Sequence, residues 1–133
     1  MKKNLFLVPL VLILLISCKK DDFFDKFPPE IMFFEGTKVE NANFVSTTLN
    51  KDSTHYVVKA RVSAPFGLKE VNIYSTRNGS QNLEKTITEF GTTPNEIFIY
   101  QDINNISGSL DVLFTAVGKD NRNTSKSFKI LKN

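Results

Sequence analysis

The sequence predicts an all-β sandwich of about seven antiparallel strands, and three observations carry this prediction. Short runs of β-branched and aromatic residues follow one another from Glu30 onward, and turn-forming residues interrupt them about every 8–12 residues. Hydrophobic and polar residues alternate along several runs, as expected for strands with one buried face. No stretch of about ten residues shows the sustained apolar period of a helix. Short strands joined by short turns favour two packed antiparallel sheets.

The first predicted strands differ in how clearly they alternate. Residues 31–35 (IMFFE) form a short apolar run that Gly36 ends, and residues 43–49 are a second short candidate. Residues 55–64 alternate best, with every second residue from Tyr56 to Ala64 apolar and Lys59 and Arg61 between them. The apolar side of this run is predicted to face the core.

The middle of the chain is organised by one strong turn signal. Residues 68–76 form a strand with Val71 and Ile73 on its buried face. The sequence Arg77-Asn78-Gly79-Ser80 then predicts a tight hairpin turn, because Asn-Gly tolerates positive φ. Residues 83–90 follow as the next strand, residues 91–95 as a loop, and residues 96–103 (EIFIYQDI) as another strand.

The last part of the chain reads as a closing hairpin. Residues 104–109 are predicted to form a loop, and residues 110–117 a strand whose inward side chains begin with Leu110. Residues 119–124 turn the chain. Residues 125–131 form the final strand, with Phe128 and Ile130 on its buried face.

This pattern resembles bacterial immunoglobulin-like modules over residues 29–131. The resemblance lies in YVVKARV at Tyr56–Val62, in GLKEVNIY at Gly67–Tyr74, and in VLFTA at Val112–Ala116 followed by a last hairpin. It implies an immunoglobulin-like β-sandwich and says little about function. Arg122 stands where the family commonly has a glycine, which leaves the type of the last turn open. The chain has no cysteine pair and no tryptophan, so it is not close to antibody domains.

Residues 1–17 are predicted to be a lipoprotein signal peptide. A basic start precedes an apolar run, LFLVPLVLILLI, which is shorter than the roughly 20 residues that span a bilayer and fits the core of a secretory signal. The sequence LISC that follows resembles the bacterial lipobox. The resemblance implies cleavage before Cys18, the only cysteine of the chain, and acylation of that residue. The alternative is an uncleaved N-terminal helix with an incidental cysteine.

The predicted lipid fixes the expected location of the protein. Acyl chains on Cys18 would hold the chain on a membrane at about 0.8 kcal/mol per buried CH2. Residues 18–29 are predicted to be an extended tether, because Pro28-Pro29 disfavours helix, and residues 30–133 the folded domain. The run KKDD after Cys18 resembles the lipoprotein export signal of Bacteroidetes. It implies the outer membrane and the cell surface, with a periplasm-facing position as the alternative.

Charge argues against nucleic acid as a partner. The whole chain has a net charge of +3, and removal of Lys2 and Lys3 with the signal peptide leaves 15 basic and 14 acidic side chains. No clustered basic face remains in the sequence of the mature chain. We therefore expect partners that are recognised by shape and hydrogen bonding.

The search for catalytic or metal-binding residues favours a protein that is not an enzyme. One His and one Cys make metal sites and nucleophilic relays unpromising, and no cofactor is expected. Ser53, His55 and Asp52 are too close along one strand to form a relay. Carboxylate pairs such as Glu84 with Glu89, or Asp102 with Asp111, lack an evident cleft. Asp120–Asn123 offers too few oxygen ligands for a dedicated calcium site.

Binding is therefore the expected activity, and three aromatic residues are the candidates. Tyr74 and Tyr100 lie on predicted strands and Phe66 lies in a turn, where their rings could stack on sugars while Gln81, Asn82, Asn104 and Asn105 supply amide hydrogen bonds. A half-buried tyrosine with its hydroxyl group at the rim is the alternative. Asp52-Ser53-Thr54 resembles a Bacteroidetes O-glycosylation sequon, which implies glycosylation of Ser53.

The sequence therefore predicts a lipid-anchored accessory binding module that captures glycans. The alternative is a structural or protein–protein interaction subunit of an outer-membrane complex, and a small hydrolase ranks last.

Overall fold

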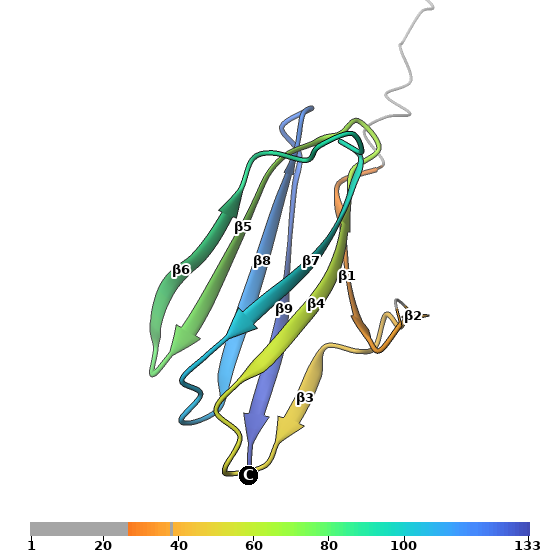
Figure 1. Cartoon of the computed structure of the whole chain (residues 1–133). Helices are drawn as coiled ribbons and strands as arrows, with labels where there is room; N and C mark the ends of the chain where they lie inside the picture. The colour runs from red at the N-terminus through yellow and green to blue at the C-terminus, as the bar shows by residue number, and fades with distance from the viewer. Residues whose placement is uncertain (1–26, 38) are drawn as a thin grey trace, which may run out of the picture.

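A computed structural model describes residues 27–37 and 39–133, so Cys18 and the predicted signal peptide lie outside the described residues. Figure 1 shows two β-sheets packed face to face. The strands are β1 (Glu30–Glu35), β2 (Val39–Glu40), β3 (Ser46–Leu49), β4 (Tyr56–Ser63), β5 (Leu68–Arg77), β6 (Ser80–Ile87), β7 (Glu96–Ile103), β8 (Leu110–Gly118) and β9 (Asn123–Lys132). The prediction of an all-β sandwich is confirmed.

The two sheets contain strands from alternating parts of the chain. One sheet has the order β2-β1-β4-β7, in which β2 is a two-residue extension of three longer strands, and the other has the order β3-β9-β8-β5-β6. Every pairing is antiparallel except that of β3 with β9, which is parallel. The predicted set of about seven antiparallel strands is thus extended by β2 and by one parallel pair. Neither β2 nor the parallel pair could be predicted from the alternation of apolar and polar residues, because this alternation does not indicate the direction of the neighbouring strand.

The core lies between the sheets and is filled by the predicted inward positions. Alternate residues of β4, β5 and β8 are buried, as the apolar alternation predicted. Phe33 lies at the centre, with its ring centroid 5.4 Å from that of Phe114 and 5.1 Å from that of Phe128, both edge-on. Two sheets of apolar side chains that interdigitate in this way stabilise the sandwich chiefly by removing apolar surface from water.

One core residue comes from a segment that was predicted to be only a loop. Ile106 in the β7–β8 connection is fully buried. Its backbone N–H donates a hydrogen bond to the Thr54 carbonyl oxygen at 2.9 Å, and its own carbonyl oxygen accepts one from Lys132 Nζ at 2.7 Å. A single apolar residue among polar neighbours has no period, so pattern analysis could not assign it to the core.

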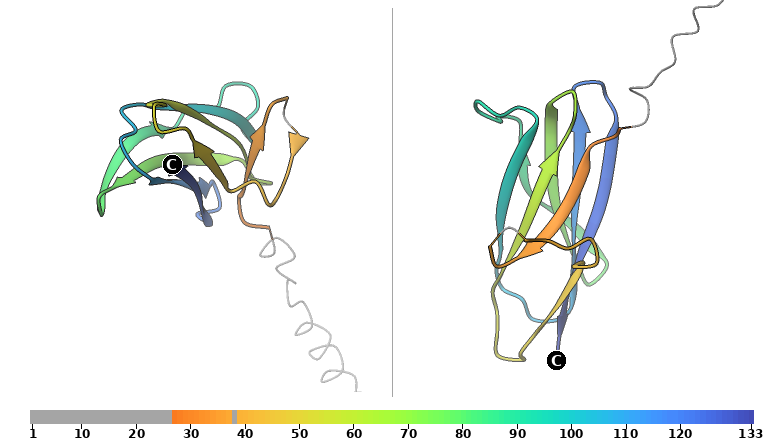
Figure 2. Two further views of the ribbon diagram at one scale, coloured as in Figure 1. Left: turned by 90° about the horizontal axis from the view of Figure 1, so that it is seen from below. Right: turned by 90° about the vertical axis from the view of Figure 1, so that its right-hand side faces the viewer.

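The sandwich has two distinct ends. In Figure 1 the upper end carries the start of β1 and the β4–β5, β6–β7 and β8–β9 connections, while the lower end carries the C-terminus and the β5–β6 and β7–β8 connections. Figure 2 shows the same two layers from below and from the side. The β5–β6 turn is the predicted one, with φ of 51° at Asn78 and 78° at Gly79. In the part of the chain described here, no helix is long and apolar enough to cross a bilayer.

Candidate functional site

The outer face of the five-stranded sheet carries Tyr74 at its middle. Tyr74 on β5 pairs across the sheet with Leu83 on β6 and with Leu113 on β8, so the three side chains form one row on the same face. Tyr74 and Leu113 are half-buried, whereas Leu83 is 58% exposed. This row is named the Tyr74 row. It offers a shallow apolar strip with a phenol at its centre.

Polar side chains flank the Tyr74 row. On one side the Thr86 hydroxyl donates a 2.6 Å hydrogen bond to Asn72 Oδ1, and Asn72 Nδ2 donates to Glu70. On the other side Thr76 pairs with Gln81, whose exposed amide lies two residues from Leu83 along β6. Amides and hydroxyl groups beside an aromatic ring are the groups that hydrogen-bond polar ligands.

The bulge in β6 explains how this face is built. The register of β5 with β6 shifts between Ile73 and Tyr74, so Glu84 is an extra residue on β6. The buried Ser75 hydroxyl donates a hydrogen bond to Glu84, whose carboxylate also lies 4.0 Å from Arg77. Glu84 is thereby used within the sheet, and is not half of the carboxylate pair with Glu89 considered from the sequence.

Tyr100 lies on the outer face of the other sheet. It is 51% exposed, and its ring meets the Phe34 ring edge-on with centroids 6.0 Å apart. Phe98 meets Phe34 in the same way, also at 6.0 Å. Phe34 is only 2% exposed although it lies outside the main core cluster. This set of three residues is named the Phe34 cluster, and it gives Tyr100 a packing role.

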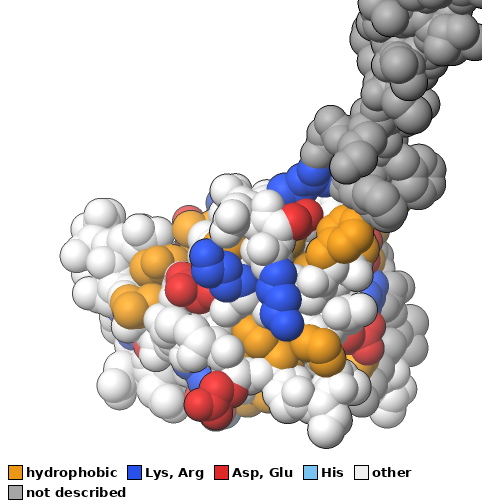
Figure 3. Space-filling view, turned by 90° about the horizontal axis from the view of Figure 1, so that it is seen from above, with side chains coloured by type: hydrophobic (Ala, Val, Ile, Leu, Met, Phe, Trp, Pro, Cys, Tyr) orange, Lys and Arg blue, Asp and Glu red, His pale blue; other side chains and the backbone are white. Residues whose placement is uncertain are grey.

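Phe66 lies in the β4–β5 turn at the end of the sandwich where β1 begins. It is 39% exposed, and the turn closes with Gly67 at a φ of 92°. A Cβ on Gly67 would come within 3.1 Å of Lys119 Cδ, so glycine suits both the φ and the contact. Figure 3 looks onto this end and shows separate apolar patches with Lys and Arg side chains between them.

The structure therefore distributes the three predicted aromatic residues over three surfaces. Tyr74 is on one sheet, Tyr100 is on the other, and Phe66 is at one end. The predicted amide partners are also divided. Gln81 shares the face of Tyr74, while Asn82 pairs with the buried Ser75 and so belongs to the opposite face of its sheet. A single site made of all these residues is not possible.

Asn104 and Asn105 lie in the β7–β8 connection at the lower end in Figure 1. Their carbonyl oxygens accept hydrogen bonds from the two terminal nitrogens of Arg77, at 2.8 Å and 2.9 Å. The β7–β8 loop is thus tied to the β5–β6 hairpin. Ser53, the predicted glycosylation site, is half-buried in the β3–β4 connection, where its N–H donates to the Asn50 carbonyl oxygen at 3.0 Å.

His55 has a partner that the sequence did not suggest. Its Nε2 lies 2.8 Å from Asp102 Oδ1, with both side chains more than half exposed. The relay of Ser53, His55 and Asp52 is therefore not the arrangement that the structure holds. Asp102 and Asp111, the other carboxylate pair considered, belong to different sheets.

Polar side chains of the β8–β9 turn pair with Lys and Arg side chains of the protein itself. Asp120 accepts a hydrogen bond from the Arg122 N–H at 3.2 Å and lies 3.6 Å from Arg122 Nε. Asn121 Oδ1 accepts a hydrogen bond from Lys69 Nζ at 3.1 Å. Within the described ranges, no group of three or more His, Cys, Asp or Glu side chains could hold a metal ion.

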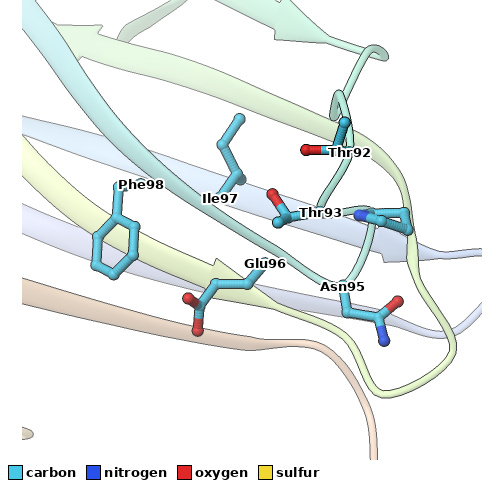
Figure 4. A pocket seen from close by; sticks show the side chains of 7 residues that line it. Thr92, Thr93, Asn95, Glu96, Ile97 and Phe98 are labelled. Atoms are coloured by element: carbon cyan, nitrogen blue, oxygen red, sulfur yellow. The ribbon is translucent and has the colours of Figure 1, made fainter.

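An open hollow lies beside the first residues of β7 (Figure 4). It has a volume of about 750 Å³, is open to solvent, and is lined by residues 92–98. Its one carboxylate, that of Glu96, lies 3.4 Å from Arg61 Nη1. Arg61 also pairs with Glu30 at 2.9 Å, so Glu96 is part of an ion-pair network on the outer face of the sheet.

Comparisons with known proteins give no family for this chain. No protein-family model matches it, and no curated protein sequence matches it significantly. Among solved structures, superoxide reductase (neelaredoxin) from Ignicoccus hospitalis superposes with a TM-score of 0.47 at 11% identity, covering 80% of each chain. A point variant of that enzyme gives the same score and identity, covering 80% of this chain and 81% of the other.

Sequence analysis missed the two residues that flank Tyr74 and the cluster under Tyr100. Leu83 and Leu113 are ordinary strand residues until the register brings them beside Tyr74. Phe34 had a detectable signal, because adjacent Phe33 and Phe34 in a strand must face opposite sides. The identity of the rings that cover Phe34 depends on the strand order, which cannot be predicted from the sequence pattern.

Proposed function

We propose that this protein is a non-catalytic, lipid-anchored binding module that captures glycans on the outer face of its five-stranded sheet. The Tyr74 row carries the proposal, because it places a phenol ring between two leucines and beside the Asn72, Thr86 and Gln81 side chains. A ring can stack on the C–H face of a sugar while amides and hydroxyl groups bind the sugar hydroxyl groups. Tyr100 is a weaker candidate, because its ring packs on Phe34.

The order of the strands supports an immunoglobulin-like module, which is a narrower assignment than a β-sandwich. Immunoglobulin-like sandwiches place strands A, B and E in one sheet and C, F and G in the other. Here β1, β4 and β7 are neighbours in one sheet, and β5, β8 and β9 are neighbours in the other. Among the described strands, this order matches an immunoglobulin-like sandwich with no strand in the position of D.

We further propose that acyl chains on Cys18 anchor the mature chain in the outer membrane, with the domain at the cell surface and a periplasm-facing position as the alternative. The twelve residues from Cys18 to Pro29 reach at most about 40 Å when extended. The tether joins β1 at the end that carries Phe66, so this end is proposed to face the membrane. Phe66 is then a candidate for contact with lipid headgroups, and the Tyr74 row stands along the side of the domain.

The anchor is tested by Cys18→Ala in cells fed a fatty-acid probe. We expect the wild-type chain to take up the probe and the variant to lose both the probe and its membrane association. Label retained by the variant contradicts lipidation at Cys18. Protease treatment of whole cells then separates the two orientations, because a surface domain is digested and a periplasm-facing domain is protected.

Glycan capture is tested on a glycan array with the wild-type chain and three variants. Tyr74→Ala is expected to abolish binding, and Leu83→Ala to weaken it, because both remove part of the Tyr74 row. Tyr100→Ala is the matched control, an exposed tyrosine of the other sheet, and is expected to bind as the wild type does. Binding that survives Tyr74→Ala contradicts the proposed surface.

A structural or protein–protein interaction subunit is the second candidate, and strand β7 favours it. β7 is a long edge strand with an apolar middle, which suits pairing with another chain. Co-purification with an outer-membrane protein, without binding to any glycan on the array, would support this candidate over glycan capture.

A further inference from the structure

The two long edge strands of the sandwich differ in how they are protected. Among the described residues, β6 ends the five-stranded sheet and β7 ends the other. β6 carries a bulge at Glu84 and a lysine at Lys85, two devices by which natural edge strands resist pairing with other chains. β7 carries neither. It pairs with β4 without interruption over eight residues, from Glu96 to Ile103.

The composition of β7 is that of a strand that can accept a partner. Its middle, Ile97 to Gln101, has no charge, proline or glycine, and its acidic residues, Glu96 and Asp102, lie near the two ends. Tyr100 is 51% exposed at the middle of the strand. A long, regular and apolar edge is the kind of edge that pairs with another strand.

The hydrogen-bond pattern tells which backbone groups of β7 face the free edge. The Ala64 N–H donates to the Asn95 carbonyl oxygen at 2.8 Å, and this pair continues the register of β4 with β7. Hydrogen-bonded and non-hydrogen-bonded pairs alternate in an antiparallel ladder. The backbone groups of Ile97 and Ile99 therefore face β4, and those of Tyr100 and Asp102 face away from it.

We propose that β7 pairs antiparallel with β7 of a second copy of this chain, with the twofold axis at Tyr100. This register sets Tyr100 opposite itself, Ile97 opposite Ile103 and Phe98 opposite Asp102, so residues that share a face of the sheet meet each other. The paired stretch, residues 97–103, uses nearly the whole strand. The two β2-β1-β4-β7 sheets become one continuous sheet.

Charge disfavours one alternative register and strand length disfavours another. With the axis at Ile99, Glu96 would lie opposite Asp102 at both ends, and like charges directly opposite destabilise a pair. With the axis at Phe98, only residues 96–100 of the strand would pair, and the β6–β7 loop would lie against the partner. With the axis at Tyr100, Asp102 meets an uncharged residue and keeps its 2.8 Å contact with His55.

The hollow in Figure 4 provides room for the partner strand. It runs along residues 92–98 and no residue of β4 lines it. In the proposed register the end of the partner's β7, near its Ile103, comes beside Ile97 at this hollow. A symmetric pair fills two such hollows, one on each copy, as an isologous interface requires.

The test uses the full chain with single cysteines introduced on each edge strand. Residues opposite each other in an antiparallel pair have Cα atoms about 4.5–5.5 Å apart, within the range that a disulfide spans. Tyr100→Cys in a Cys18→Ala background is therefore expected to form a covalent dimer under mild oxidation. Leu83→Cys, on the protected edge and even more exposed than Tyr100, is the matched control and is expected to form no covalent dimer.

Sedimentation of the Cys18→Ala chain supplies the second measurement, which does not depend on disulfide chemistry. We expect a dimer at micromolar concentration, loss of the dimer in Tyr100→Lys, where two ammonium groups meet at the axis, and retention of the dimer in Leu83→Lys. Equal cross-linking at both positions, a monomer without either substitution, or cross-linking of Tyr100→Cys to a different protein would each overturn the proposal.

Discussion

The two outer faces of the sandwich each carry a tyrosine, and the two tyrosines are surrounded differently. Tyr74 lies in a row with Leu83 and Leu113 and has polar side chains on both sides. Tyr100 is 51% exposed, yet its ring covers Phe34, which is only 2% exposed. Exposure alone would select Tyr100 as the binding residue. The neighbours of each ring indicate the opposite, because a ring that covers another apolar ring is part of the packing of the domain.

The Phe34 cluster extends apolar packing to the outer face of the β2-β1-β4-β7 sheet. Phe33 packs into the core and Phe34 packs against Phe98 and Tyr100 on the opposite side, so the two faces of β1 are both buried. The outer face of the five-stranded sheet carries Thr, Asn and Ser side chains beside the Tyr74 row. The difference indicates that one face contributes to stability and the other is available to a ligand.

The largest expected effect is on stability, from removal of the ring under Tyr100. Phe34→Ala is expected to lower the free energy of unfolding by about 3–5 kcal/mol, because it deletes a fully buried ring. Leu113→Ala, at the half-buried position beside Tyr74, is expected to cost about 1 kcal/mol. Urea unfolding followed by circular dichroism measures both. Equal losses would show that the two outer faces contribute equally to stability.

A smaller effect is expected at the two tyrosines themselves. Tyr100→Ala is expected to cost about 1 kcal/mol, since an edge-on aromatic pair contributes about 0.5–1.5 kcal/mol beyond burial. Tyr100→Phe keeps the ring and is expected to leave stability unchanged. If Tyr100→Phe destabilised as much as Tyr100→Ala, the hydroxyl group and not the ring contact would be the source of the effect.

The smallest expected effect concerns Tyr56, which packs between the two sheets. Its ring is stacked on Phe128, with centroids 6.0 Å apart. Burial raises the pKa of the Tyr56 phenol above its ordinary value of 10.0; a hydrogen bond with Thr47 opposes this rise and the Glu35 carboxylate adds to it. The folded state therefore favours the neutral phenol more than the unfolded state does.

Stability linked to Tyr56 is accordingly full below about pH 10 and is lost as the pH rises through the raised pKa of the folded state. Tyr56→Phe is expected to flatten this alkaline decline, measured as the midpoint of urea unfolding between about pH 9 and pH 11. An identical decline in Tyr56→Phe would assign the pH dependence to other groups.

The strands were more predictable from the sequence than their partners. Alternation located the buried faces of β4, β5, β8 and β9, and Asn78-Gly79 located the β5–β6 turn. The parallel β3–β9 pair, the role of Ile106 and the Phe34 cluster were not predictable, because each depends on which distant segment becomes a neighbour. A local pattern tells that a side chain faces inward or outward and does not tell what it meets.

The candidate site was predictable only as a set of single residues. Tyr74, Tyr100 and Phe66 were all plausible contacts in the sequence, and the fold separates them. The two-residue turn at Asn78-Gly79 already pairs Tyr74 with Leu83, but the bulge at Glu84, which brings Thr86 opposite Asn72, has no signal in the sequence. The choice between the two tyrosines as binding residues therefore depends on the neighbours that the fold places around each ring.

The proposed function depends most on the claim that the Tyr74 row, and not the Phe34 cluster, binds the ligand. The direct measurement is calorimetric titration of a glycan selected from the array into the wild-type chain, Tyr74→Ala and Tyr100→Ala, with folding of each variant checked by circular dichroism. We predict that Tyr74→Ala weakens the affinity by at least about tenfold, or about 1.4 kcal/mol, and that Tyr100→Ala leaves it unchanged. Full affinity in Tyr74→Ala together with its loss in folded Tyr100→Ala would contradict binding at the Tyr74 row.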